Sequence, residues 1–123
     1  MNQLHHRILV VDDDPIVCAS IQIILSVDNY ASDVASNGEQ ALLKHRQNQY
    51  DLVITDFAMP GMKGDELATS LKEQFPRTPM ILLSGAPPRD RPPGVDVTLL
   101  KPCSPSILLQ SVGRLLMRQP RQE

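Results

Sequence analysis

The chain is poor in aromatic side chains, with two Tyr, two Phe and no Trp among its 123 residues. Because exposed rings are what stack nucleic-acid bases, this scarcity disfavours a base-stacking surface, and the core must be aliphatic. An excess of one charge is missing too, since 12 Lys and Arg stand against 14 Asp and Glu. Without a basic face to neutralise phosphates, we expect no direct binding to nucleic acid.

Cysteine and long apolar runs are also scarce. Only Cys18 and Cys103 are present, neither has a metal-ligand spacing, and no cationic start precedes an apolar stretch as in a signal peptide. No apolar run approaches the roughly 18 residues that a membrane span requires. These absences predict a soluble domain in the reducing cytoplasm, with no membrane insertion.

Short aliphatic runs alternate with longer amphipathic segments along the chain. This alternation is typical of strand–helix units around a parallel sheet, and unbroken apolar runs are typical of strands covered on both faces. The predicted strands are residues 8–11, 31–35, 52–55, 80–83 and 97–100. We therefore predict an α/β fold with a five-stranded, doubly wound parallel sheet.

Helical spacing of apolar residues predicts helices between these strands. The first helix follows Asp14, a good N-cap, and Pro15, which suits the first helical position. The others are expected over residues 38–45, over residues 65–75, and from Ser104 and Pro105 onward. The length suits one domain, so we expect residues 1–123 to form it, with a core of about 7–118 and a tail or linker start at 119–123.

The connection between the fourth and fifth strands interrupts this pattern. It runs from Gly85 to Val95 and contains prolines at positions 87, 88, 92 and 93. Proline inside a helix removes a hydrogen bond and clashes with the preceding turn. We therefore expect the helix in this connection to be short or missing, with at most one turn around residues 89–91.

Polar side chains follow four of the predicted strands. Asp12 and Asp13 follow the first strand, Asp56 follows the third, Ser84 the fourth and Lys101 the fifth. In an open parallel sheet, the ligand crevice lies beyond the carboxyl ends of the strands. We therefore expect these five side chains to meet in one crevice.

Three carboxylates in one crevice repel one another. Each pair at about 4 Å costs about 4 kcal/mol for an effective dielectric constant of about 20, and the repulsion raises their pKa values unless a cation lies among them. Oxygen ligands without His or Cys suit Mg²⁺, which takes one or two carboxylates and commonly binds together with a phosphate. The sequence therefore predicts a site for Mg²⁺ or Mn²⁺.

The motifs around these residues resemble those of the receiver domains of response regulators and hybrid histidine kinases. The resemblance covers nearly the whole chain, through ILVVDDDP at 8–15, ITDFAMPGMKG at 54–64, ILLSG at 81–85 and LLKP at 99–102. It implies a flavodoxin-like sheet with strand order 2-1-3-4-5 and helices on both faces. It also implies signal transduction by phosphorelay in a bacterial two-component system.

The resemblance also implies a role for each polar residue in the transfer. Asp56 would be the phosphoacceptor, which attacks the phosphorus of a phosphohistidine on a histidine kinase or phosphotransfer protein. Lys101 would pair with one phosphoryl oxygen, and Ser84 would donate a hydrogen bond to another. The domain would thus catalyse its own phosphorylation and dephosphorylation and signal to an output partner, which the sequence leaves open.

The resemblance assigns the metal ligands as well. Asp13 and Asp56 would bind Mg²⁺ through their carboxylates, and the backbone carbonyl of Ala58 would be a third ligand. Asp12 would act largely through bound water. Neutralising charge on the transferred group is the main catalytic need of phosphoryl transfer, and such a metal helps to meet it.

The chain departs from the family pattern at the output side. Three residues before Lys101, where relatives carry a ring that turns inward on phosphorylation, stands Thr98. The helix expected between the fourth and fifth strands, part of the output face in many relatives, is short or missing. We therefore expect that this domain does not dimerise through that face.

Two other functions are compatible with part of the pattern. A receiver-like module could bind partners without being phosphorylated. A phosphatase of the haloacid dehalogenase type is suggested by Asp12 and Asp14, two residues apart, although Ile16 stands where that family wants Thr or Val. The phosphate would be carried by Asp56 in a receiver, by Asp12 in the phosphatase and by neither acid in the module.

Overall fold

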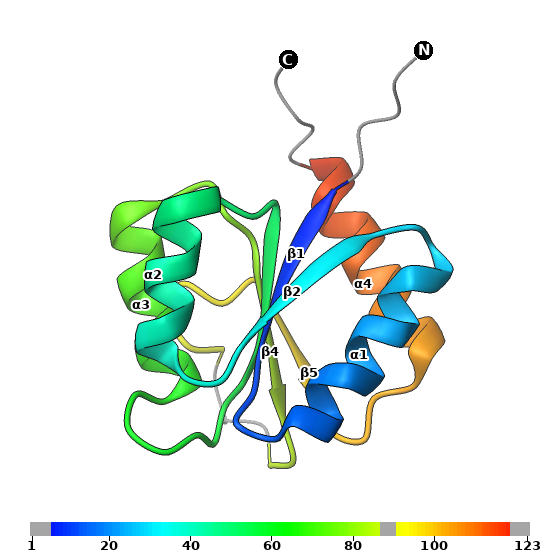
Figure 1. The fold of residues 1–123 in the computed structure, drawn as a ribbon, viewed down its shortest axis with the longest axis horizontal. Helices are drawn as coiled ribbons and strands as arrows, with labels where there is room; N and C mark the ends of the chain where they lie inside the picture. Colours follow the sequence, from blue (N-terminus) through cyan, green and yellow to red (C-terminus); the bar gives the residue numbers. More distant parts are fainter. Residues whose placement is uncertain (1–5, 87–90, 119–123) are drawn as a thin grey trace.

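The fold was analysed in a computed structural model, which describes residues 6–86 and 91–118. Strands and helices alternate along the first two thirds of the chain (Figure 1). In chain order they are β1 (Arg7–Val11), α1 (Pro15–Val27), β2 (Ala31–Ala35), α2 (Gly38–Asn48), β3 (Leu52–Asp56), α3 (Gly64–Gln74), β4 (Met80–Ser84), β5 (Val97–Leu100) and α4 (Pro105–Arg118).

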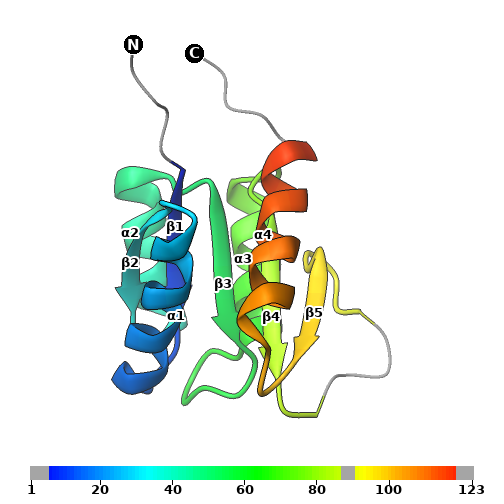
Figure 2. The same cartoon turned by 90° about the vertical axis from the view of Figure 1, so that its right-hand side faces the viewer.

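The strands form one parallel sheet in the order β2-β1-β3-β4-β5. Helices α2 and α3 cover one face, and α1 and α4 cover the other (Figure 1). Figure 2, which looks onto α1 and α4, shows the strand arrowheads pointing to the same edge of the sheet. The predicted fold class and strand order are confirmed.

Two aliphatic layers hold the helices to the sheet. Because successive side chains of a strand point to opposite faces, Leu9 and Val11 pack toward α2 and α3, while Ile8 and Val10 pack toward α1 and α4. All four are essentially inaccessible to solvent. The short, unbroken apolar runs in the sequence are thus explained by strands that are buried on both sides.

Helix starts follow their capping residues. The Asp14 carboxylate accepts a hydrogen bond from the Ile16 N–H at 2.9 Å, as expected for the cap of α1. Asn37 caps α2 in the same way through the Gln40 N–H at 2.8 Å. The prediction that α2 stops at residue 45 was wrong, because the polar residues 46–48 continue the helix on its exposed side until Gln49, with φ 42°, ends it.

The connection from β4 to β5 contains no helix over its described residues, 85–86 and 91–96. Most of the turn expected at residues 89–91 lies outside the residues that the structure describes. In place of a helix, Val95 is buried against the α2 and α3 side of the sheet. The carboxylate of Asp96 accepts hydrogen bonds from the Met80 N–H at 2.7 Å and from Lys72 Nζ at 3.1 Å. The connection is thus attached directly to β4 and α3.

Gly94 allows this close attachment. Its φ of 86° lies in the left-handed region, and a Cβ there would come within 2.9 Å of the Ala68 carbonyl oxygen in α3. Both the backbone conformation and the available space therefore require glycine. The loop approaches α3 more closely than any side chain would allow.

Gly94→Ala is expected to lower the free energy of unfolding by roughly 1–3 kcal/mol, through the strained φ and the contact with Ala68. Urea unfolding measures the change. Gly113→Ala is the matched control: a Cβ at Gly113 meets nothing within 4 Å. This helical glycine should gain stability of roughly 0.5–1 kcal/mol on the same change. Equal effects in the two variants would contradict the close approach at Gly94.

In α2, His45 is completely buried. Its Nδ1 accepts a hydrogen bond from the Tyr50 N–H at 3.0 Å, and its Nε2 lies 3.1 Å from Thr78 Oγ1. This arrangement fits a neutral ring whose Nε2–H donates to Thr78. Burial lowers the pKa of His45 to about 4, although the charge of Asp51 opposes the shift.

We predict an acid-dependent loss of stability from His45. Because its folded pKa of about 4 lies below the ordinary value of 6.5, the unfolded chain binds the proton more tightly. The contribution of the neutral ring to the free energy of unfolding is therefore fully present above pH 6.5, and it is lost as the pH falls from 6.5 toward about 4. Urea unfolding between these pH values should show an extra slope of roughly 1 kcal/mol per pH unit.

His45→Gln, which cannot take up this proton, isolates the effect. Its stability should change less steeply with pH than that of the native chain, since the buried imidazole is gone. An NMR titration of the His45 imidazole with a midpoint near 6.5 would contradict the prediction, as would parallel stability curves for the two proteins.

Candidate functional site

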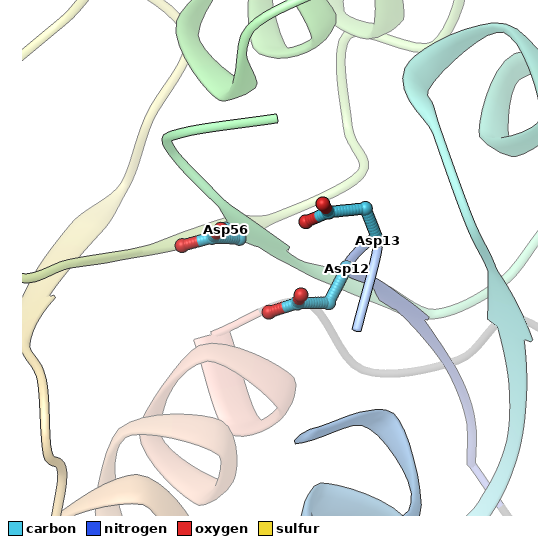
Figure 3. A group of neighbouring side chains, drawn as sticks. All are labelled: Asp12, Asp13 and Asp56. Atoms are coloured by element: carbon cyan, nitrogen blue, oxygen red, sulfur yellow. The ribbon is translucent and has the colours of Figure 1, made fainter. Parts of the chain in front are cut away.

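Three acidic side chains converge at the carboxyl edge of the sheet (Figure 3). Asp12 and Asp13 follow the last residue of β1, and Asp56 is the last residue of β3. These strands are neighbours in the sheet. One carboxylate oxygen from each residue lies within 4.8 Å of the others. The structure thus brings together the acids that the sequence indicated.

The environment of Asp12 favours a cation. The side chain is 3% exposed; Oδ1 accepts the Asp14 N–H at 2.9 Å, but Oδ2 has no hydrogen-bond partner among residues 6–86 and 91–118. Burial raises the pKa of Asp12, and the charges of Asp56 and Asp13 add to the rise against the opposing effects of the Asp14 N–H and Lys101. A buried acceptor without a donor is costly, so a metal ion or its bound water fits here.

Lys101 provides a positive charge beside these acids. Its Nζ lies 2.8 Å from Asp56 Oδ1 and 3.6 Å from Asp12 Oδ2, the latter too long for a hydrogen bond. The backbone explains its position, because the Lys101 N–H donates to the Ser84 carbonyl at 2.9 Å and continues the pairing of β5 with β4. Burial alone would lower the pKa of Lys101, but its hydrogen bond to Asp56 and the charges of Asp56 and Asp12 raise it. The ammonium therefore stays charged.

Ser84 lies at the same edge of the sheet, and its hydroxyl is hydrogen-bonded to the backbone of Ala86. It is 4% exposed, and its Oγ donates to the Ala86 carbonyl at 3.0 Å and accepts the Ala86 N–H at 3.2 Å. The hydroxyl is therefore held in a tight turn after β4. Ala58, the expected carbonyl ligand, lies exposed in the loop after β3, two residues beyond Asp56.

Two residues that sequence reasoning did not place at the site support its backbone. Gly64 begins α3, where a Cβ would strike the carbonyl oxygen of Asp56, so only glycine lets the helix start there. Cys18, in α1, donates its S–H to the Asp12 carbonyl at 3.4 Å. Gly64 ends the motif at 54–64, but neither contact can be read from the sequence, because each joins separate elements. Cys18 is buried as expected for a small apolar residue, whereas Cys103 is only partly buried.

Residues 8–113 match the family described as the response regulator receiver domain. The chain belongs to this family, the phosphorelay receivers of two-component systems. This membership, with Asp14 engaged as a helix cap, sets aside the phosphatase hypothesis. None of the helices in the described residues has the length and hydropathy of a membrane span.

Two curated relatives are regulators from bacteria. The transcriptional regulatory protein ResD of Bacillus subtilis is 34% identical over 117 residues, which cover 91% of this chain and 48% of ResD. The regulatory protein VanRB of Enterococcus faecalis is 32% identical over 117 residues, which cover 91% of this chain and 53% of VanRB. The chain thus spans about half the length of these relatives.

A solved structure shares both the fold and part of the sequence. The response regulator TrrA from Thermotoga maritima, solved in complex with Mg²⁺-BeF, has a TM-score of 0.85 and 35% sequence identity. The match covers 90% of this chain and 99% of that chain.

Divalent metal is expected to stabilise the domain through the acidic cluster. At a Mg²⁺ concentration about 10-fold above the dissociation constant, the free energy of unfolding should rise by about 1.4 kcal/mol. Asp13→Asn should reduce the rise, since it removes one carboxylate from the cluster, and chemical unfolding with and without Mg²⁺ measures it.

Asp14→Asn is the matched control for this measurement. It also removes one acidic charge from the same turn, but Asn caps a helix as well as Asp does, and Asp14 is not in the cluster. The control should keep the full response to Mg²⁺. If Mg²⁺ left the stability of the native chain unchanged, or stabilised Asp13→Asn as much as the native chain, the acidic cluster would not be the metal site.

Proposed function

We propose that this domain accepts a phosphoryl group on Asp56 from the phosphohistidine of a histidine kinase or phosphotransfer protein. One observation carries the proposal: a lysine ammonium lies 2.8 Å from the Asp56 carboxylate, within a group of three carboxylates. An anionic group bound to Asp56 would therefore lie beside the Lys101 ammonium. The excess of carboxylates beside that single lysine would in turn attract a divalent metal.

The transfer uses few protein groups. A carboxylate oxygen of Asp56 attacks phosphorus, the bond from phosphorus to the histidine nitrogen breaks, and the electron pair returns to the imidazole, which takes up a proton. Lys101 pairs with a phosphoryl oxygen as the charge shifts, and Ser84 donates a hydrogen bond to another. Such transfers depend on positioning and charge neutralisation, which an ammonium and a hydroxyl supply.

The metal site is the second part of the proposal. Asp13 and Asp56 would hold Mg²⁺ or Mn²⁺ with the carbonyl of Ala58, and Asp12 would contact it through water. The ion would neutralise charge shared between the phosphoryl group and the acids. Two features support a hard cation with oxygen ligands: the buried Oδ2 of Asp12 has no hydrogen-bond partner in the described part of the chain, and the cluster consists of carboxylates alone. The Mg²⁺-BeF complex of the similar TrrA domain supports it too.

The proposal extends to the context of the domain. We infer that residues 1–123 form a single receiver domain with its core at about 7–118, which catalyses its own phosphorylation and dephosphorylation. A cytoplasmic location, no direct binding to nucleic acid and an output through a partner stay predictions. The output face built on the β4–β5 connection includes residues 87–90, which lie outside the described part of the chain.

Intact-mass measurement after incubation with Mg²⁺ and acetyl phosphate tests this function. The native chain should gain one phosphate adduct that requires Mg²⁺, and Asp56→Asn should gain none, because the nucleophilic carboxylate is gone. Asp14→Asn, which keeps the acidic cluster intact, should be modified like the native chain.

The alternative functions predict different masses for the native chain and for Asp56→Asn. A native chain that gains no adduct would favour the unphosphorylated interaction module. An adduct that survives in Asp56→Asn would show that another acid is the acceptor.

A further inference from the structure

The hydroxyl of Thr98 is buried near the candidate site without an assigned role. Its Oγ1 is shielded from solvent and finds no hydrogen-bond partner in the part of the chain that the structure describes. Buried hydroxyl groups are normally hydrogen-bonded, because leaving one unpaired costs its hydration. Thr98 also stands three residues before Lys101 on the same strand. An unpaired group at this position calls for an explanation.

The strand register places Thr98 beside Ser84. In the pairing of β4 with β5, Leu82 is opposite Thr98 and Ser84 is opposite Leu100. Because alternate residues of a strand share a face, Thr98 and Ser84 are diagonal neighbours on one face of the sheet. With strands about 4.8 Å apart and a rise of about 3.3 Å per residue, the Cβ atoms of such a pair are about 8 Å apart. Two short hydroxyl side chains can bridge this span through one water molecule.

In the present structure the Ser84 hydroxyl is turned toward the backbone of Ala86. Its single hydrogen is donated to the Ala86 carbonyl, and its oxygen accepts the Ala86 N–H. If Ser84 turned to donate that hydrogen to a phosphoryl oxygen, it would release both groups of Ala86. Ala86 is exposed, so water can satisfy them. Both lone pairs of the Ser84 oxygen would then be free to accept hydrogen bonds from other donors.

We propose that Thr98 is a positioning residue for phosphoryl transfer that acts through Ser84. Its hydroxyl donates, through one bridging water, to the Ser84 oxygen once Ser84 has turned from Ala86 toward the phosphoryl group. Hydrogen bonds in a chain strengthen one another, so this link holds Ser84 as a donor. The inference rests on the proposed function of Asp56 and Ser84.

The rate constant for phosphorylation of Asp56 by acetyl phosphate, followed by intact mass, tests the inference. Thr98→Val keeps the shape of the side chain without the hydroxyl, and should lower the rate constant about fivefold, the usual worth of one hydrogen bond. Thr98→Ser keeps the hydroxyl and should stay within about twofold of the native rate constant.

A double-mutant cycle separates positioning from a general structural effect. Ser84→Ala removes the group through which Thr98 acts, so adding Thr98→Val to it should cause no further loss of rate. An equal loss from Thr98→Val in the native and Ser84→Ala backgrounds would overturn the inference.

The resting state provides a second readout that needs no phosphorylation. Thr98→Val removes an unpaired buried hydroxyl, so the urea midpoint of the unphosphorylated domain should be unchanged or higher. A lower midpoint would mean that the hydroxyl already has a partner, and the inference would fail. A Thr98→Val variant phosphorylated as fast as the native chain overturns only this inference, whereas no adduct on the native chain overturns the proposed function as well.

Discussion

Three carboxylates and one ammonium lie together at the carboxyl edge of the sheet. The rest of the architecture depends on this imbalance of charge. Lys101 is close enough to bond Asp56 and lies 3.6 Å from Asp12, but one positive charge cannot neutralise Asp12, Asp13 and Asp56 together. The protein holds the acids there against their repulsion because the strands that carry them are fixed on both faces by aliphatic layers. The fold thus maintains a surplus of negative charge, which an added cation can relieve.

The remaining architecture serves the same edge. Parallel pairing brings the ends of β1, β3, β4 and β5 to one line, so residues distant in sequence become neighbours. Helices start or pack there only where small or capping residues allow it, as at Gly64 beside Asp56 and at Asp14 before α1. The few aromatic side chains pack at the two aliphatic layers, Tyr50, Phe57 and Phe75 on the side of α2 and α3 and Tyr30 on the side of α1 and α4.

The fold class and the convergence of the acids could be predicted from the sequence, because both depend on local signals: apolar runs, and the polar residue that follows each. What could not be predicted depends on contacts between segments. The bonds of Ser84 to Ala86, the unpaired Thr98 hydroxyl and the approach of Gly94 to α3 leave no periodic trace. The end of α2 was missed because residues 46–48 are polar and exposed. The roles of the site residues stay predictions, since geometry alone does not test them.

The attachment of the β4–β5 connection to α3 determines which elements a displacement of that connection would reach. A packed helix at this place would move as a rigid rod and carry a displacement across the surface. Here the far end of the connection is fastened, through Asp96 to Lys72 and Met80 and through Gly94 against Ala68. Residues 94–96 are therefore joined to α3 and β4 by direct contacts, so a displacement of this end of the connection would act on α3 and β4 together.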